Sequence, residues 1–306
     1  MISNFLFHRV NPQRDALWDP MDVPLFEKCV RFISRNYSVT QLEELVLSKN
    51  DLKSNRKFAT IVFDDGYKDN IEYAAPILDK YKVKASFYIV TDCIEKNIPT
   101  WTYILDYSFS STKQKKIDLN FSFLPPDLRI EELSDGAARM KYVRELKPVM
   151  KKLSHDDRMK IMETVSLSYN DIELPKLMMD WNDLDQLKNV GHYIGSHTVT
   201  HCMLGTMSNE EEITNELTQS AAEIKKHLGH FPVTISYPVG SYNDTTIRLS
   251  KEAGYKIGLA VKGKKFDASK DDLFEIPRIE LYNESWFKSQ LRIKDVIGKI
   301  NGLIKR

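Results

Sequence analysis

Cysteine is scarce in this chain, and the few that occur are not placed for a disulfide framework. Three cysteines, Cys29, Cys93 and Cys202, are scattered over 306 residues, and no two of them form a Cys-x-x-C pair. An odd, dispersed set of this kind is typical of a protein in a reducing compartment. The sequence therefore does not indicate a small secreted domain stabilised by disulfide bonds.

The sequence also lacks long apolar runs and an excess of one charge. No stretch approaches the roughly 20 apolar residues that span a bilayer, and residues 1–9 (MISNFLFHR) do not form a secretory signal. Because 44 basic residues balance 43 acidic ones, nothing in the net charge of +1 points to nucleic acid. We therefore expect a cytoplasmic protein without a nucleic-acid partner, provided that no export signal was removed from the chain.

Patterns of buried strands and amphipathic helices alternate along most of the chain. This order favours parallel strands joined by helical crossovers. It yields about six or seven βα units around one core, so we expect an α/β fold of the (β/α) barrel type. The predicted strands cover residues 2–7, 59–63, 85–90, 193–196, 231–237 and 256–261, and the predicted helices cover residues 23–36, 68–81, 182–189, 208–228 and 244–253.

Two segments depart from this alternation. Residues 92–178 hold charged, helix-like segments and no convincing pair of strands, so we interpret them as a helical insertion within a single domain of residues 1–306. Residues 284–305 predict a terminal amphipathic helix. That helix could rest on a membrane surface, but a helix that covers the barrel is the commoner arrangement.

A largely apolar run over residues 59–63 ends in two adjacent carboxylates, Asp64 and Asp65, followed by Gly66. The run predicts a strand buried on both faces, and Gly66 permits a turn that a side chain would hinder. Paired acids at the carboxyl end of such a strand are typical of enzyme sites in open sheets and barrels. A turn rich in Asp and Gly explains the same residues taken alone, so their interpretation depends on the rest of the chain.

A second polar segment, residues 195–201 (GSHTVTH), places His197 and His201 four residues apart after another predicted strand. On a helix or a tight turn, this spacing lets two imidazoles bind one divalent metal ion, although histidine pairs are also common on surfaces. One carboxylate of the Asp64-Asp65 pair would complete the open three-ligand site typical of catalytic zinc. The neighbouring carboxylate could then act as a base on a metal-activated water.

Three motifs stand in order along the chain: VFDDG at residues 62–66, SHTVTH at residues 196–201 and SYPVGSYN at residues 236–243. Together they resemble the motifs of the polysaccharide deacetylases, which are carbohydrate esterase family four, also called the NodB-homology family. The resemblance covers the chain outside the insertion. It implies a distorted (β/α)7 barrel that removes acetyl groups, usually from N-acetylated sugars, with a divalent metal, for which we expect Zn2+.

The resemblance implies a role for each matching residue. Asp64 would be the general base, and Asp65, His197 and His201 would hold the metal. The backbone N–H of Val239 would donate a hydrogen bond to the oxyanion. The residues expected to line the substrate cleft are Trp181, Tyr237, Pro238, Val239 and Tyr242.

The chain departs from the family pattern in two places. In the third motif, Ser236 replaces the usual arginine and Val239 replaces the usual aromatic residue, and no histidine follows His230 to supply the family's late general acid. Residues 7–10 (FHRV), however, resemble the start of a circularly permuted subset that includes poly-N-acetylglucosamine deacetylases, in which the acid comes from the first strand. This resemblance implies His8 as the general acid, and a buried structural histidine is the alternative.

Residues 276–279 (IPRI) also resemble a late segment of that subset. At the end of a strand, Arg278 could pair with Asp64 and keep it ionised. It would thereby replace the missing arginine of the third motif. A surface salt bridge is the alternative interpretation.

These residues lead us to expect a metal-dependent deacetylase of an amino sugar in polysaccharide or lipid-linked glycan biosynthesis. Its partner would be an N-acetylated sugar, an oligosaccharide or a lipid-linked glycan, and contact with a membrane surface is not favoured. Two alternatives stay open. One is another small-acyl hydrolase, such as a deformylase or an O-acetyl esterase, and the other is a non-catalytic carbohydrate-binding protein.

Overall fold

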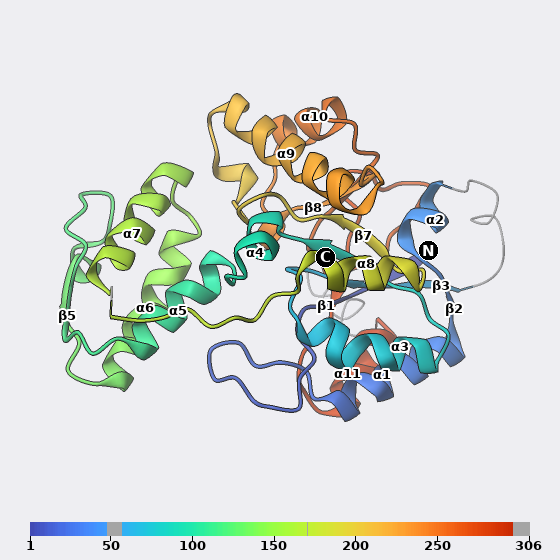
Figure 1. The fold of residues 1–306 in the computed structure, drawn as a ribbon, viewed down its shortest axis with the longest axis horizontal. Coiled ribbons are helices and arrows are strands. Elements are labelled where there is room, and N and C mark those ends of the chain that lie inside the picture. The colour runs from blue at the N-terminus through green and yellow to red at the C-terminus, as the bar shows by residue number, and fades with distance from the viewer. Residues whose placement is uncertain (48–56, 170, 296–306) are drawn as a thin grey trace, which may run out of the picture.

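The structure, a computed structural model, describes residues 1–47, 57–169 and 171–295, which form a curled sheet surrounded by helices (Figure 1). Within these residues, seven strands follow one another in the order β10–β1–β3–β4–β7–β8–β9, with the short β2 paired beside β3. Every strand pair of this sheet is parallel. The strands are β1 (Ile2–Phe7), β2 (Ser38–Val39), β3 (Phe58–Phe63), β4 (Ser86–Ile89), β7 (Tyr193–Ser196), β8 (Thr234–Ser236), β9 (Ile257–Leu259) and β10 (Ile279–Glu280).

The two ends of this sheet approach each other through the segment that leads into β10. Leu259 in β9 forms an isolated parallel bridge with Ile276, and the Ala260 N–H donates to the Ile276 carbonyl at 2.9 Å. A single bridge replaces a full ladder there, so the barrel is distorted and partly open. The predicted α/β class and distorted (β/α) barrel are confirmed.

The helices cover the outside of the sheet with their apolar faces. Helix α1 (Val23–Asn36) carries Pro24 in its first turn, where the missing N–H costs nothing, and it buries the stripe of residues that its periodicity predicts. Helices α1, α3 and α11 lie together below the sheet in Figure 1, and α9 and α10 lie above it. The remaining bounds are α2 (Leu42–Leu47), a π-helical turn at Asn70–Ala74, α3 (Ala75–Lys80), α8 (Trp181–Asn189), α9 (Glu210–Leu228), α10 (Asp244–Glu252) and α11 (Trp286–Ile293).

The described part of the predicted terminal helix is α11. Trp286 packs edge-on against Phe32 of α1, and Ile293 is buried. Residues 296–306, the rest of that prediction, lie outside the described residues. Among the helices that the structure describes, none combines the length and the apolar composition needed to cross a lipid bilayer.

The insertion forms a lobe between β4 and β7 that projects from one side of the barrel (Figure 1). The lobe has its own core, which includes Leu105, Phe109, Tyr142 and Ile161. The expectation that it holds no strand pair is wrong, because β5 and β6 form a small antiparallel pair. Each has three residues, too short to show alternation in the sequence. The elements are α4 (Thr91–Lys96), α5 (Trp101–Ser111), β5 (Lys116–Asp118), a 3₁₀ turn (Pro126–Leu128), β6 (Ile130–Glu132), α6 (Gly136–Met150) and α7 (His155–Ser168).

Arg158 of α7 holds the lobe against the barrel. Its buried guanidinium donates to the carbonyls of Met150 and Leu153 at 3.2 and 3.0 Å, and to Oγ1 of Thr206 at 3.0 Å. It also packs over the ring of Trp101 at 5.5 Å. Because Thr206 follows β7, these contacts give the lobe a defined position beside the barrel.

Glu43 of α2 closes the end of the barrel at which the strands begin. Its buried carboxylate accepts hydrogen bonds from Ser86 at 2.6 Å, from Tyr88 at 2.8 Å and from Thr234 at 2.8 Å. Ser86 and Thr234 are the first residues of β4 and β8. Burial raises the pKa of Glu43 above its ordinary value of 4.5, although these hydrogen bonds oppose the shift.

We predict that Glu43 makes the protein less stable as pH rises. Since the folded state holds this proton more tightly than the unfolded chain, the free energy of unfolding should fall from about pH 4.5 up through the raised pKa. Glu43→Gln keeps the shape and removes the charge, so its stability should lose this pH dependence. Urea unfolding between about pH 5 and pH 8 measures the difference. Glu44→Gln, on the exposed neighbouring residue, is the control, and an unchanged pH slope in Glu43→Gln would contradict the prediction.

Candidate active site

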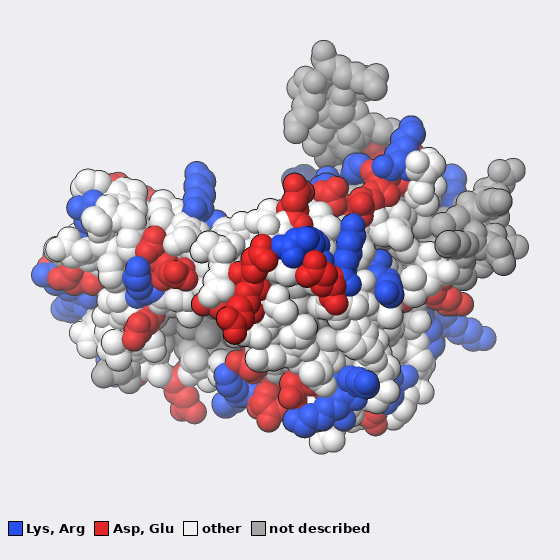
Figure 2. Space-filling model, turned by 90° about the horizontal axis from the view of Figure 1, so that it is seen from above, with Lys and Arg blue, Asp and Glu red and all other residues white. Residues whose placement is uncertain are grey.

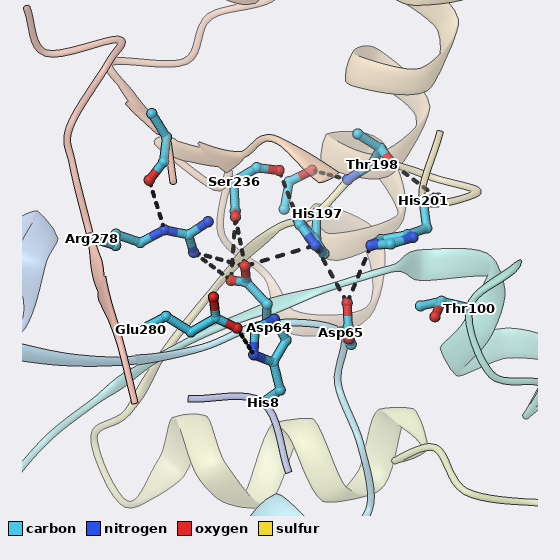
Figure 3. Close-up of polar contacts among 12 residues, drawn as sticks. His8, Asp64, Asp65, Thr100, His197, Thr198, His201, Ser236, Arg278 and Glu280 are labelled. Atoms are coloured by element: carbon cyan, nitrogen blue, oxygen red, sulfur yellow. Dashed lines mark hydrogen bonds and ion pairs between the residues drawn. The ribbon is translucent and has the colours of Figure 1, made fainter. Parts of the chain in front are cut away.

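The side chains of the site follow the carboxyl ends of the barrel strands. His8 follows β1, Asp64 and Asp65 follow β3, His197 follows β7, and Glu280 ends β10 (Figure 3). Because parallel strands end at the same edge of the sheet, residues far apart in the sequence meet there. They line a pocket of about 220 Å³, and the residues predicted from the sequence that line it are His8, Asp64, Asp65, His197, His201, Val239 and Arg278.

Asp65, His197 and His201 are buried and converge on one point. Oδ1 of Asp65 lies 3.4 Å from Nε2 of His197 and 3.4 Å from Nε2 of His201 (Figure 3). Two ligands at about 2.0–2.1 Å from a tetrahedral zinc ion lie roughly 3.4 Å apart. Within the described residues, Oδ2 of Asp65 and Nδ1 of His201 have no hydrogen-bond partner, which is rare for buried polar atoms. The donor set and its spacing fit a divalent metal ion.

The two histidines are prepared differently for this role. Nδ1 of His197 lies 2.7 Å from the Ser236 carbonyl, which only accepts, so Nδ1 carries the proton and Nε2 faces Asp65. Metal-binding histidines usually have such a second partner. Burial lowers the pKa of His201 to about 3, which favours the neutral imidazole that binds metal. Burial also acts to lower the pKa of His197, but Asp64 and Asp65 outweigh it and raise that pKa, so a metal would compete with a proton there.

Asp64 is held beside the three candidate ligands by a buried arginine. Nη1 of Arg278 donates to both carboxylate oxygens at 2.8 Å, and Oγ of Ser236 lies 3.2 Å from each of them. Burial alone would raise the pKa of Asp64, but Arg278 and then His197 outweigh it and hold the pKa below its ordinary value. The carboxylate is therefore ionised at neutral pH and can accept a proton. The pairing that the sequence indicated for Arg278 is present and buried, and Ser236 occupies the place of the family's arginine.

Backbone strain is concentrated around this pocket. Asp65, Thr198, His201 and Val239 have φ angles of 75°, 69°, 61° and 57°, in the left-handed region that favours glycine. Such conformations cost on the order of 1–3 kcal/mol each and persist where the surrounding structure holds them. They are especially unusual for the β-branched residues Thr198 and Val239. Two of these residues are candidate metal ligands, and the other two are Thr198 beside His197 and Val239 in the turn that follows β8. Clustering of strained residues is typical of functional sites.

His8 lies on the opposite side of Asp64 from the two other histidines (Figure 3). Its Nδ1 is 3.5 Å from Oε1 of Glu280, and its ring lies 5.2 Å from the ring of Trp18. The His8 carbonyl accepts a hydrogen bond from the Asn70 side chain at 2.7 Å, which fixes the backbone there. The His8 imidazole lines the pocket and is partly accessible. His8 is therefore not fully buried, as a structural core histidine would be.

Four residues expected in the substrate cleft are placed elsewhere. Tyr237 is buried and stacks on Tyr242, whose hydroxyl donates to Glu275 at 2.8 Å. Trp181 stacks on His227 at 4.2 Å, beside a separate groove on α9. Pro238, Tyr237, Tyr242 and Trp181 do not line the pocket, whereas Val239 does. Proximity to a motif in sequence did not indicate which way these rings face.

Sequence reasoning missed several residues that line the pocket. Glu280 stands two residues after Arg278, and residues two apart on a strand share a face, so a longer predicted strand would have indicated it. Trp18 comes from an irregular loop, and Lys147 and Lys151 come from the insertion. No local pattern links these three residues to the barrel.

The fold and the site together define an α/β barrel with a candidate catalytic pocket at the ends of its strands. The profile described as "Polysaccharide deacetylase" matches residues 51–258, which is more than half of the chain. The chain belongs to the polysaccharide deacetylase family. This membership supports a carbohydrate deacetylase.

Individual relatives are distant. YxkH of Bacillus subtilis (strain 168), which bears the name of a polysaccharide deacetylase, is 20% identical over 239 residues, covering 78% of this chain and 57% of YxkH. The chain thus spans little more than half the length of that curated relative.

The deacetylase PplD of Streptococcus pyogenes, solved with acetate, is 19% identical with a TM-score of 0.63, over 95% of this chain and 97% of PplD. IcaB of Ammonifex degensii is 15% identical with a TM-score of 0.61, over 96% and 97% of the two chains. At these identities the solved structures establish the fold.

Proposed function

We propose that this protein removes acetyl groups from the nitrogen of amino sugars in a glycan, using a divalent metal held by Asp65, His197 and His201. The observation that carries the proposal is that one pocket holds both this ligand set and the Asp64–Arg278 pair. A ligand set alone would equally suit a structural metal site. An ionised carboxylate beside it, held by a buried arginine, supplies the base that hydrolysis needs.

Asp64 accepts the proton of the attacking water. When bound, the metal would polarise the acetamide carbonyl and make the water more acidic. Arg278 and Ser236 keep the Asp64 carboxylate ionised and oriented, so its oxygens are ready to take the proton. The same contacts prevent the carboxylate from rotating towards the ligands.

The Val239 N–H is placed to stabilise negative charge on the former carbonyl oxygen. Val239 lies in a 3₁₀ turn, Pro238–Gly240, directly after β8, and the first amides of such a turn have no partner inside it. Its side chain is 38% exposed and lines the pocket. A backbone donor fixed in this way costs no reorganisation when the oxyanion forms.

His8, in its protonated form, gives a proton to the departing amine nitrogen. Glu280, whose Oε1 lies 3.5 Å from Nδ1, holds the ring. Asp64, as the base, and His8, as the acid, thus line the same pocket. The neighbouring strands β3 and β1 set the distance between them. The substrate enters as an N-acetylated sugar, and a pocket of about 220 Å³ is smaller than the roughly 300–1,000 Å³ that hold drug-sized ligands. One sugar unit therefore occupies it.

Acetate release from N-acetylglucosamine oligomers by the zinc-loaded protein tests the proposal, together with the zinc content of the purified protein. We expect release of acetate and one zinc per chain, and loss of release on chelation. Formate release from N-formyl sugars, or acetate release from O-acetylated sugars alone, would identify another small-acyl hydrolase. Sugar binding without any release would identify a non-catalytic protein. The cytoplasmic location and a lipid-linked substrate remain predictions, which cell fractionation and assays with lipid-linked sugars would test.

The role of His8 predicts a dependence on the leaving group. His8→Asn should lower kcat for an N-acetylated oligosaccharide by about 10²–10⁴-fold, because the leaving amine needs a proton. For an aryl acetate, whose phenolate leaves without a proton, the same variant should keep most of its activity. Turnover of both substrates by the wild type and the variant measures the difference. Equal losses on both substrates would contradict a general-acid role.

A further inference from the structure

Helix α6 of the insertion presents a row of cations next to the active site. Arg144, Lys147 and Lys151 stand three and four residues apart, so they share one face of the helix. All three line a groove of about 470 Å³ between the lobe and the loop that contains Leu17. Lys147 and Lys151 also line the active-site pocket. The groove therefore adjoins the pocket where the acetamide would react.

The charge of this row is mostly uncompensated. Lys147 pairs with Asp106, the acidic residue that lines the groove. Arg144 and Lys151 make no hydrogen bond or ion pair with another described residue, although the carboxylates of Asp106 and Glu280 act on Lys151 at longer range. Three cations thus face one carboxylate inside the groove, and Glu280 lies in the adjoining pocket. Over the face shown in Figure 2, by contrast, acidic and basic side chains are interspersed, and the net charge of the chain is only +1. The positive charge next to the active-site pocket is thus a local arrangement and not a consequence of the overall charge of the chain.

A neutral N-acetylated glycan gives these cations no partner. Its deacetylation also leaves an ammonium group, which nearby lysines and arginine would repel. An acidic group on the glycan removes both problems, because a carboxylate or a phosphate pairs with arginine in a bidentate way and with lysine as a point charge. The buried contacts of Arg158 hold the lobe, so the row keeps its distance from the pocket.

We propose that this groove binds an anionic group of the glycan, a uronate carboxylate or a phosphodiester, one sugar away from the N-acetyl group that is removed. The proposal rests on the proposed function and names its substrate class. Arg144 and Lys151 are the specificity-determining residues. They act on binding of the neighbouring unit and leave the chemistry to the residues at the strand ends.

Binding to the inactive Asp64→Asn protein tests the proposal by calorimetry. The probes are a hexamer of N-acetylglucosamine, a hexamer that alternates an N-acetylated hexosamine with glucuronate, and N-acetylglucosamine linked through a phosphodiester to a second sugar. We expect at least one anionic probe to bind about tenfold or more tightly than the neutral hexamer. Adding Arg144→Gln, which lies outside the active-site pocket, should weaken that preference and leave the neutral hexamer within about twofold. Adding Lys151→Gln as well should abolish the preference.

Lys152→Gln is the matched control. Lys152 follows Lys151, is exposed and lines neither the groove nor the pocket, so its loss should change no affinity by more than about twofold. Equal affinity for all three probes, or an equal effect of the control, would overturn the proposal. The anionic probe that loses affinity identifies the anion. Acetate release by the wild type is measured separately. A failure of the proposed deacetylase function is thereby distinguished from a failure of the groove to bind an anionic group.

Discussion

Asp64→Asn should lower kcat for acetate release by about 10²–10⁴-fold while the protein still binds zinc. The amide keeps the shape of the carboxylate but cannot accept the proton of the attacking water. The three candidate ligands, Asp65, His197 and His201, are unchanged. Acetate release and zinc content, measured on the same preparation, check both parts of the prediction. A fully active variant would rule out Asp64 as the base.

The variant also breaks a buried ion pair, and this effect needs a control of its own. Removing one partner of such a pair typically costs about 3–5 kcal/mol, because Arg278 stays buried without its counter-charge. Asp69 forms a comparable buried pair with Arg9 at 2.9 Å, outside the pocket. Because Arg9 also pairs with Asp15 at 2.6 Å, Asp69→Asn should lose stability in urea unfolding, though less than Asp64→Asn, and keep most of its activity. A similar loss of activity in both variants would attribute the effect to stability.

His201→Asn should remove the bound metal and, with it, acetate release. Asparagine tolerates the left-handed backbone that His201 adopts at φ 61°, so the loop keeps its shape and the ligand alone is lost. Loss of a hydrogen-bond partner of a metal ligand typically weakens metal binding by about 10–100-fold. Loss of the ligand itself should weaken zinc binding by more than that. Competition with a zinc chelator measures the affinity, and metal analysis measures the content.

His227→Gln serves as the control for the loss of a histidine. His227 lies on α9, stacks on Trp181 and does not line the pocket. Its replacement should leave zinc content and turnover unchanged. If His201→Asn binds zinc as tightly as the wild type, the ligand assignment fails, whatever happens to activity.

Local sequence patterns predicted secondary structure well, except where a side chain contacts residues that are far away in the sequence. The strand at residues 2–7 and the helix at residues 23–36 have the predicted bounds, because the burial of neighbouring residues leaves a periodic record in the sequence. Residues 40–43 (TQLE) match a pattern in which the glutamate caps its own helix. Glu43 instead turns into the barrel and binds three buried hydroxyls. Those partners lie on β4 and β8, which the local pattern does not report.

The sequence by itself determined the fold class, the family motifs and the identity of the carboxylates and histidines, since each depends on residue types at short spacing. Only the tertiary structure decided which of these residues meet. Asp64 and Arg278 are 214 residues apart, and β1 must lie between β3 and β10 to bring them together. The same strand order sets Glu280 beside His8, and the packing of the lobe sets Lys151 at the pocket. Periodicity records whether a residue is buried, whereas strand order and barrel closure decide what it is buried against.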